Sequence, residues 1–296
     1  MKAKGAILSA QGASFDVICV GEALWTLASA SFWGPRPGAP DPLRPAGGAV
    51  SAAAALARAG LRVGLCTALA DDEAGRSLLE RMRTTGVDLG GVALAPPRAG
   101  LFLAEASAGE HRLVAPRLED QLPIVIPERW SAGVLLISGL SPALERAAGF
   151  CKAARAARRA GEVVMLDINA RWHLWTGQDS RSIQSILVEA DVVRCSSADL
   201  AALWMDTGFV RAAMRPDAIL VVSDGGNPAR ALGPFGEVSV APKVVSPVSP
   251  SGAGDAFTAA VCADLVRSGG AGADRPEQWL RALGSGHEAA AARARR

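Results

Sequence analysis

The chain has 296 residues, half of them hydrophobic, and its 31 basic and 29 acidic residues leave a net charge of +2. A chain of this length and hydrophobicity can bury a large core, and its near-neutral charge argues against nucleic acid as the main partner. No apolar stretch reaches the roughly 18 residues that a membrane span needs, and five cysteines without C-x-x-C spacing predict reduced thiols.

The first third of the chain alternates between strand and helix signals. Lys2 and Lys4 precede an apolar patch that is too short for a secretory signal, which predicts a cytoplasmic protein without a membrane partner. A β-type run at Asp16–Val20 predicts a strand, and the Pro/Gly-rich segment 31–45 predicts a loop. We then expect an Ala-rich helix that ends at Arg58, a strand at 63–68 and a helix at 74–84.

Strand signals continue in the middle of the chain, where two β-type runs, Gly100–Ala106 and His111–Ala115, predict a hairpin. From Val134 onward, strands and helices alternate. We expect strands at 134–138, 162–166, 191–194 and 218–223, and helices at 142–160, 180–189 and 198–205. This alternation predicts an α/β fold with a doubly wound, mostly parallel sheet. Ligands on such sheets bind beyond the carboxyl ends of the strands, where Asp167 and Ser223 fall.

The most informative stretch is Ser249–Phe257, which follows an apolar-alternating run at 240–248 and precedes a segment of unbroken helical composition. The pattern therefore predicts a strand at 240–248, then a loop of small residues that leads into a helix. Three small residues, Gly252, Ala253 and Gly254, let backbone N–H groups approach an anion closely. The N-terminus of the helix adds a partial positive charge, so the stretch predicts a phosphate-binding loop.

Asp255 stands just inside this turn. A carboxylate beside a phosphate site repels the phosphate, so its presence is explained if it takes a proton from a hydroxyl that attacks phosphorus. The alternative is an acidic residue in the first turn of a helix, where it stabilises the helix dipole and does nothing else.

Polar residues at the ends of predicted strands form three further groups of candidate site residues. Asp167, Asn169 and Arg171 alternate after a buried strand and would share one face, and the planar guanidinium suits a phosphate or the carboxylate of a sugar acid. The alternative is a plain polar loop. Ser196 and Asp199 also fit the cap of a helix, and the segment that starts at Ser223-Asp224-Gly225 also fits a tight turn between strands.

Several of these motifs resemble those of the ribokinase-like (PfkB) carbohydrate kinases. The G-A-G-D-x-F core of their second signature, D-T-T-G-A-G-D-x-F, is intact at 252–257, where S-P-S replaces D-T-T. Gly47-Gly48 resembles the first signature, and Gly21-Glu22 resembles the end of the first strand. The segment from Asp167 to Trp175 resembles the D-x-N-x-R-x-x-L-W pattern of fructokinases and 2-keto-3-deoxygluconate kinases.

The resemblance implies a single ribokinase-like domain over 1–296, a three-layer α/β/α sandwich with a small β lid from about 22–45 and 97–117. It implies ATP-dependent transfer of the γ-phosphate to a hydroxyl of a monosaccharide or sugar acid, with fructose or 2-keto-3-deoxygluconate favoured. ATP and Mg²⁺ are the implied cofactors, and a homodimer through the lid is an implied assembly. A monovalent-cation site near the loop is also implied, but Ser249 in place of Asp weakens it.

The resemblance also implies roles for individual residues. Asp255 would take the hydroxyl proton, and the amides of Gly252–Asp255 would stabilise the transferring phosphoryl group. Sugar contacts would come from Thr26, Gly47, Gly48, Ser51, Asn169 and Arg171. Nucleotide contacts would come from Ser196, Ser223, Gly225, Gly252 and Gly254. Asp199 would organise Mg²⁺ through water.

Departures from the family pattern keep a second function open. The substituted positions are Thr26 for Asp, Ser51 for Asn, Ala70 for Gly, Ser196 for Asn and Ser249 for Asp. They are compatible with a degenerate member that binds sugar or nucleotide as a sensor or interaction protein. However, the residues of the chemistry are kept while the sugar contacts have changed, and this favours an altered substrate over lost activity.

Overall fold

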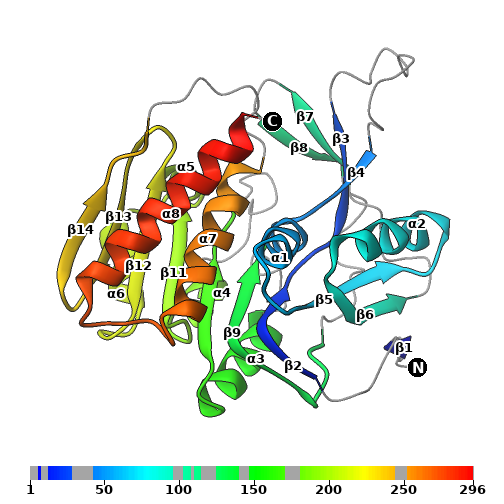
Figure 1. The fold of residues 1–296 in the computed structure, drawn as a ribbon, viewed down its shortest axis with the longest axis horizontal. Coiled ribbons are helices and arrows are strands. Elements are labelled where there is room, and N and C mark those ends of the chain that lie inside the picture. The colour runs from blue at the N-terminus through cyan, green and yellow to red at the C-terminus, as the bar shows by residue number, and fades with distance from the viewer. Residues whose placement is uncertain are drawn as a thin grey trace.

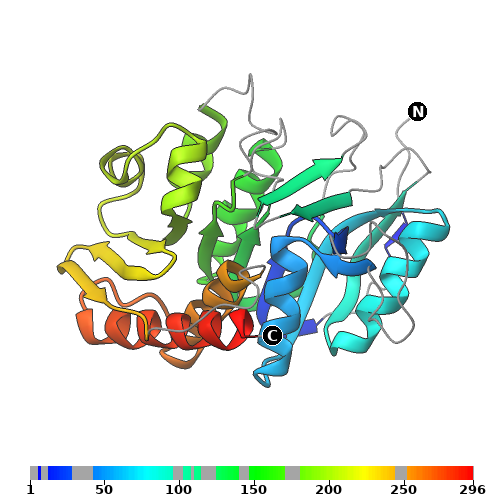
Figure 2. The ribbon, with the colours of Figure 1, turned by 90° about the horizontal axis from the view of Figure 1, so that it is seen from above.

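A ten-stranded sheet forms the middle of the molecule, and helices cover both of its faces (Figures 1 and 2). The computed structural model describes residues 6–7, 13–28, 43–95, 103–107, 110–114, 125–139, 147–170, 181–243 and 252–295. In order across the sheet, the strands are β1 (Ala6–Ile7), β6 (Asp88–Ala95), β5 (Val63–Ala70), β2 (Ala13–Val20), β9 (Trp130–Ser138), β10 (Val163–Asp167), β11 (Val192–Ser196), β12 (Ile219–Asp224), β13 (Asn227–Gly233) and β14 (Gly236–Val240).

Neighbouring strands are parallel from β6 to β12, and only the outer strands β1, β13 and β14 pair antiparallel. This confirms the predicted α/β class with a mostly parallel sheet. The strands are apolar on both faces because both faces are covered, as in β11, where Val192 faces one core cluster and Val193 faces the other.

The helices form two layers. One layer contains α1 (Gly48–Arg58), α2 (Glu73–Met82), which a 3₁₀ turn (Arg83–Thr85) extends, α7 (Ala253–Arg267) and α8 (Pro276–Ala294). The other contains α3 (Ala147–Arg159), α4 (Arg181–Leu187), α5 (Ser197–Ala202) and α6 (Thr207–Ala213). In Figure 2 the blue α1 and the orange and red α7 and α8 lie on one side of the sheet, and the green helices lie on the other.

A second, four-stranded sheet stands beyond the carboxyl edge of the large one (Figure 1). Its strands, in order, are β4 (Leu43–Ala46), β3 (Leu24–Ala28), β7 (Leu103–Ser107) and β8 (Glu110–Val114). The predicted hairpin is confirmed as the antiparallel pair β7 and β8. The prediction that 31–45 is a loop was wrong at its end, where β4 begins. Pro45 is tolerated there because β4 is an edge strand and needs no second row of hydrogen bonds.

Other parts of the chain differ from the sequence prediction in detail. The strands β6, β13 and β14 and the helices α6 and α8 were not predicted, because their apolar residues are sparse or their composition is dominated by alanine and glycine. The tight turn near Ser223 is confirmed, since β12 and β13 form a hairpin with Gly225 at φ 54. The strand predicted at 240–248 was wrong at 241–243, because β14 ends at Val240, and 244–248 lie outside the described residues.

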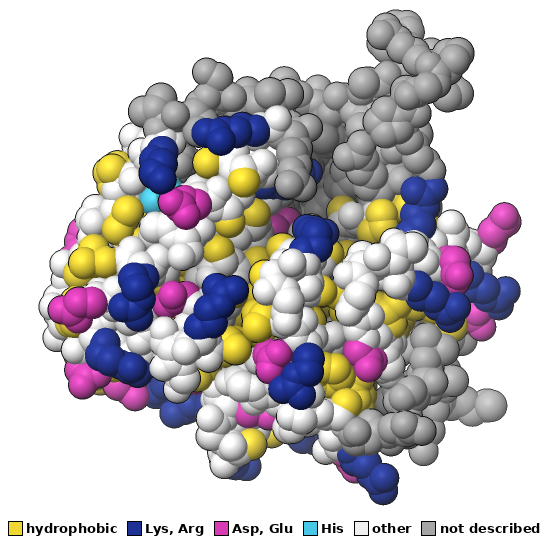
Figure 3. Space-filling model, in the orientation of Figure 1, with side chains coloured by type: hydrophobic (Ala, Val, Ile, Leu, Met, Phe, Trp, Pro, Cys, Tyr) yellow, Lys and Arg dark blue, Asp and Glu magenta, His cyan; other side chains and the backbone are white. Residues whose placement is uncertain are grey.

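The surface of the described residues agrees with the near-neutral charge. On the face shown in Figure 3, basic and acidic side chains are interspersed with hydrophobic ones. All five cysteines are free and buried, as the sequence predicted, and burial raises the pKa of Cys195 to about 12. In the part of the chain that the structure describes, no helix is both long and apolar enough to cross a bilayer.

Candidate active site

A row of buried polar side chains crosses the carboxyl ends of four neighbouring strands. Ser138, Asp167, Arg194 and Ser223 each follow, two residues later, a core residue that faces the α1–α7–α8 layer. Because side chains alternate along a strand, all four project toward this layer. They are at most 8% exposed, and they replace the apolar core at the edge of the sheet where ligands of parallel sheets bind.

Hydrogen bonds join this row to α7. The Asp167 carboxylate accepts from Ser138 Oγ and from Thr258 Oγ1 of α7, both at 3.0 Å, and from Arg194 Nη1 at 3.0 Å. Arg194 Nη2 donates to Ser223 Oγ at 2.6 Å. Burial alone would lower the pKa of Arg194, but the carboxylates of Asp167 and Asp199 outweigh it and hold that pKa above its ordinary value. The row therefore fixes the start of α7 on the sheet.

The start of α7 has the geometry of an anion site. Gly252, the N-cap, lies in the left-handed region at φ 77, which glycine adopts without strain, and no side chain caps the helix. The first helical hydrogen bond runs from the Ala256 amide to the Gly252 carbonyl at 3.0 Å. The amides of Ala253, Gly254 and Asp255 precede it, so they have no acceptor within the helix, and they lie at its positive end.

Asp255 and Asn169 meet at this helix start. Asp255 is half-buried in the first turn of α7, and Asn169 Nδ2 lies 3.5 Å from its Oδ1. Asn169 has φ 43, a left-handed conformation that few residues other than glycine adopt. This backbone turn follows β10 and directs the amide toward α7. Two predicted site residues that are 86 positions apart in the sequence are thus neighbours.

The two glycines of the first motif pack against the same place. A Cβ at Gly48 would collide with Asn169 Nδ2 and Ser138 Oγ, so a larger residue would force these two side-chain ends to shift. Gly47 has φ 112 and packs against the Glu22 carbonyl, and its own carbonyl accepts from the Ser51 amide at 2.9 Å. The glycine pair, Asn169 and the loop of α7 therefore form one cluster.

Two further sugar-contact candidates are Thr26 and Arg171. The backbone of Thr26 lies in β3, paired with Arg44 and Ala104, so it belongs to the small sheet. Arg171 lies outside the described residues. Their sugar contacts stay predictions.

Ser196 and Asp199 form a capping box at the start of α5. Asp199 accepts from the amide and hydroxyl of Ser196, both at 2.7 Å, and from the Ala170 amide at 2.7 Å. Both carboxylate oxygens are thus engaged and the residue is 4% exposed, which confirms the capping alternative. The described residues hold no group of three or more His, Cys, Asp or Glu side chains suited to a metal. The water-mediated metal role of Asp199 stays a prediction.

Two predicted nucleotide contacts have structural roles here. Ser223 accepts from Arg194, and Gly225 forms the turn between β12 and β13. Their contacts with a nucleotide stay predictions. Sequence reasoning missed Arg194, Ser138 and Thr258; the available signal was an arginine inside the apolar run that forms β11.

A mostly parallel sheet with a glycine loop and a carboxylate at the start of a helix defines a class, the phosphotransferases of ribokinase-like fold. The model of the pfkB family carbohydrate kinases matches residues 15–296. The chain belongs to this family and is a sugar kinase.

Relatives of known name agree with this assignment. The 5-dehydro-2-deoxygluconokinase of Shouchella clausii is 28% identical over 284 residues, covering 87% of this chain and 85% of the relative. Fructokinase-1 of Zea mays is 29% identical over 241 residues, covering 75% and 74%. The fructokinase of Xylella fastidiosa with bound ATP has a TM-score of 0.78 at 23% identity, over 95% of this chain and 92% of that chain. The last comparison shows the shared fold.

Proposed function

We propose that the protein transfers the γ-phosphate of ATP to a hydroxyl of a ketose or a sugar acid, with fructose or 2-keto-3-deoxygluconate as the favoured substrates. The observation that carries this proposal is the meeting of three separate motifs. Asp255, Asn169 and Gly48 lie together at a helix start whose first amides have no acceptor within the helix. This arrangement supplies a base, an orienting amide and an anion hole in one place.

In this mechanism Asp255 accepts the proton of the attacking hydroxyl, a contribution of about 10²–10⁴-fold in rate. The Asn169 amide, 3.5 Å from the carboxylate, holds it in orientation. The amides at the start of α7 stabilise the negative charge on the transferring phosphoryl group, and the loss of one such donor costs roughly 3 kcal/mol. Mg²⁺ carried by ATP would neutralise phosphate charge when bound, and no step is assigned to a metal held by Asp199.

The substrate class rests on relatives and on residue types. The named relatives include a kinase of a sugar acid and fructokinases. Thr26 and Ser51 replace the Asp and Asn of the family pattern, so the hydroxyl contacts differ from the usual set. Arg171 offers a guanidinium that suits the carboxylate of a sugar acid. The small sheet β4-β3-β7-β8 is proposed as the lid of this single domain and as the surface of a homodimer.

The test is an ADP-release assay with ATP over a panel of fructose, 2-keto-3-deoxygluconate, 5-dehydro-2-deoxygluconate, ribose and adenosine. We expect turnover with a ketose or sugar acid and little with ribose or adenosine. Turnover with adenosine or ribose alone would contradict the substrate class. Silence across the panel, together with measurable ATP binding, would favour the sensor alternative.

A further inference from the structure

Arg293 lies beside the proposed anion hole, although it comes from the last turn of α8 and from no motif of the sequence. The C-terminal end of α8 runs next to the start of α7 (Figure 1). A Cβ built on Gly252 would be 3.1 Å from Arg293 Nε, and 3.6 Å and 3.7 Å from Nη2 and Cζ. The guanidinium therefore fills the space directly beside the glycine that begins the loop.

The charge of Arg293 has no acceptor in the part of the chain that the structure describes. Its side chain is half-buried, yet no described residue forms an ion pair or hydrogen bond with it. One turn earlier on its own helix stand Ala289 and Ala290, which cannot pair with it. A half-buried guanidinium carries five N–H donors that require acceptors, so its position calls for an anion.

A second arginine on the other side of the loop shows the contrast. A Cβ on Gly254 would be 3.4 Å from Arg194 Nη2, so this guanidinium backs the loop from the side of the sheet. Arg194 is already held by Asp167 and Ser223 and is 5% exposed. Of the two guanidiniums that flank the loop, Arg293 is the one whose donors are open to a ligand.

We infer that Arg293 is a phosphate-binding residue, whose guanidinium donates to phosphoryl oxygens of bound nucleotide next to the amides of the Gly252 loop. The inference rests on the proposed function, because it places the phosphates of ATP at this loop. A planar guanidinium binds phosphate with two parallel hydrogen bonds and keeps its charge at all physiological pH values. Arg293 thus adds a full positive charge where backbone amides supply partial charges.

A purely structural role is the competing explanation, because basic residues in the last turn of a helix stabilise its dipole. Arg295 provides the matched control. It lies at the C-terminal end of the same helix and shares that effect, but it is exposed, and the three atoms nearest to a Cβ built on Gly252 all belong to Arg293. A dipole role would make the two arginines equivalent, whereas phosphate binding makes them different.

The experiment compares Arg293→Ala, Arg293→Lys and Arg295→Ala with the unaltered full chain, using calorimetric titration with AMP-PNP, ADP and adenosine. For Arg293→Ala we expect AMP-PNP binding to weaken about 10- to 100-fold, the range for losing a charge-assisted pair. Adenosine binding should be unchanged, Arg293→Lys should recover part of the loss, and Arg295→Ala should match the unaltered chain. Thermal unfolding of each variant checks that the fold is kept.

Three results would overturn the inference: equal AMP-PNP affinity in Arg293→Ala and the unaltered chain, an equal loss in Arg295→Ala, or an equal loss for adenosine. If Arg293→Ala does not fold, Arg293→Lys decides, because it keeps the helix and the charge but loses the bidentate geometry. Since binding is measured without turnover, an unaltered chain that binds AMP-PNP but phosphorylates no sugar would contradict the proposed function and leave this inference standing.

Discussion

The strand β11 carries a cluster of charged residues at each end, and the two clusters differ in environment. Asp191 directly precedes the strand, and Arg194 lies near its carboxyl end. Both clusters pair arginines with carboxylates at similar distances. The first lies at the boundary with solvent, whereas the second is enclosed by the sheet and α7.

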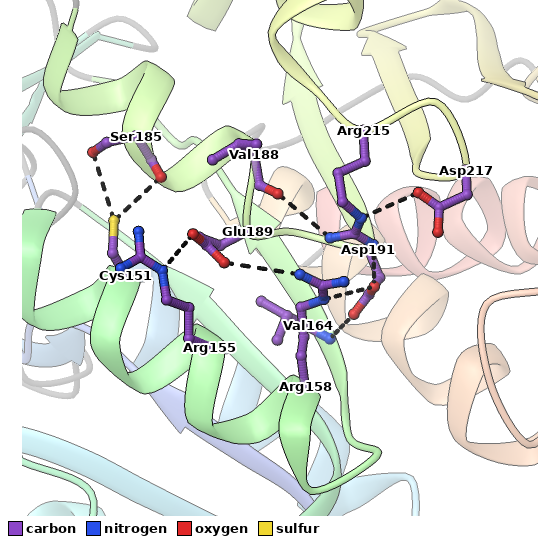
Figure 4. Close-up of polar contacts among 10 residues, drawn as sticks. All are labelled: Cys151, Arg155, Arg158, Val164, Ser185, Val188, Glu189, Asp191, Arg215 and Asp217. Atoms are coloured by element: carbon purple, nitrogen blue, oxygen red, sulfur yellow. Dashed lines mark hydrogen bonds and ion pairs between the residues drawn. The ribbon is translucent and has the colours of Figure 1, made fainter.

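The cluster at the amino end of β11 joins α3, the end of α4 and the loop after α6 (Figure 4). Asp191 accepts from the Val164 amide at 2.8 Å and pairs with Arg158 at 3.5 Å and with Arg215. Glu189 pairs with Arg155 at 2.6 Å, but the Arg155 side chain is 55% exposed. Water and salt screen such pairs, so they add little to stability.

The cluster at the carboxyl end is buried away from solvent. The side chains of Arg194 and Asp167 are 6% and 1% exposed, and their ion pair is completed by hydroxyl groups. Breaking a buried ion pair is costly, because removing one partner leaves the other charge buried and uncompensated. Pairs of arginine and carboxylate thus link helices and loops at one end of the strand, and the same kind of pair positions the proposed active site at the other end.

The largest effect is expected from breaking the buried cluster. Arg194→Met would leave the Asp167 carboxylate buried and uncompensated, and we expect the free energy of unfolding to fall by about 3–5 kcal/mol. Urea unfolding with linear extrapolation measures this loss. The double variant Arg194→Met, Asp167→Asn removes both charges and should recover part of it. A loss under about 1 kcal/mol in the single variant would show that the buried pair is not a strong constraint.

An intermediate effect is expected where the glycine pair meets the site. Gly48→Ala places a Cβ too close to Asn169 Nδ2, so this amide must shift from its present place 3.5 Å from Asp255 Oδ1. Misplacement on this scale costs about 10²-fold in kcat, which steady-state kinetics would measure. The control is Gly149→Ala in α3, where a Cβ meets open space and helix propensity favours alanine. Equal kcat values for the two variants would show that a side chain at position 48 does not disturb the proposed active site.

The smallest effect is expected at the exposed end of β11. Arg155→Ala removes a screened pair with Glu189, so the melting temperature should change by about 2 °C or less and kcat should not change. Differential scanning calorimetry at low and high salt measures the shift. A large drop in melting temperature would mean that this cluster supports the fold as strongly as the buried one.

The sequence predicted the loop at 252–255 and its catalytic candidate because those residues are contiguous and their chemistry is local. The α/β class was also predictable, because the spacing of apolar residues along the chain distinguishes strands from helices. The sequence did not predict the buried row, whose members are brought together by the fold. Asp167 and Thr258 are 91 positions apart, and no local rule links them. Arg293 was missed for the same reason.

The Ser196–Asp199 pair shows the opposite case. The four residues 196–199 fit both a helix cap and a metal-site motif, so the local sequence could not distinguish the two alternatives. The structure shows the cap and adds a tertiary contact that no local rule predicts, from the Ala170 amide to the second carboxylate oxygen of Asp199. The metal role stays a prediction.

The most direct measurement is the turnover of Asp255→Asn, an isosteric change that removes the proposed base and leaves the helix start intact. The variant should fold and bind AMP-PNP like the unaltered chain, while kcat with the best sugar of the panel falls at least about 100-fold. A variant that keeps most of its activity would contradict the assignment of Asp255 as the group that takes the hydroxyl proton.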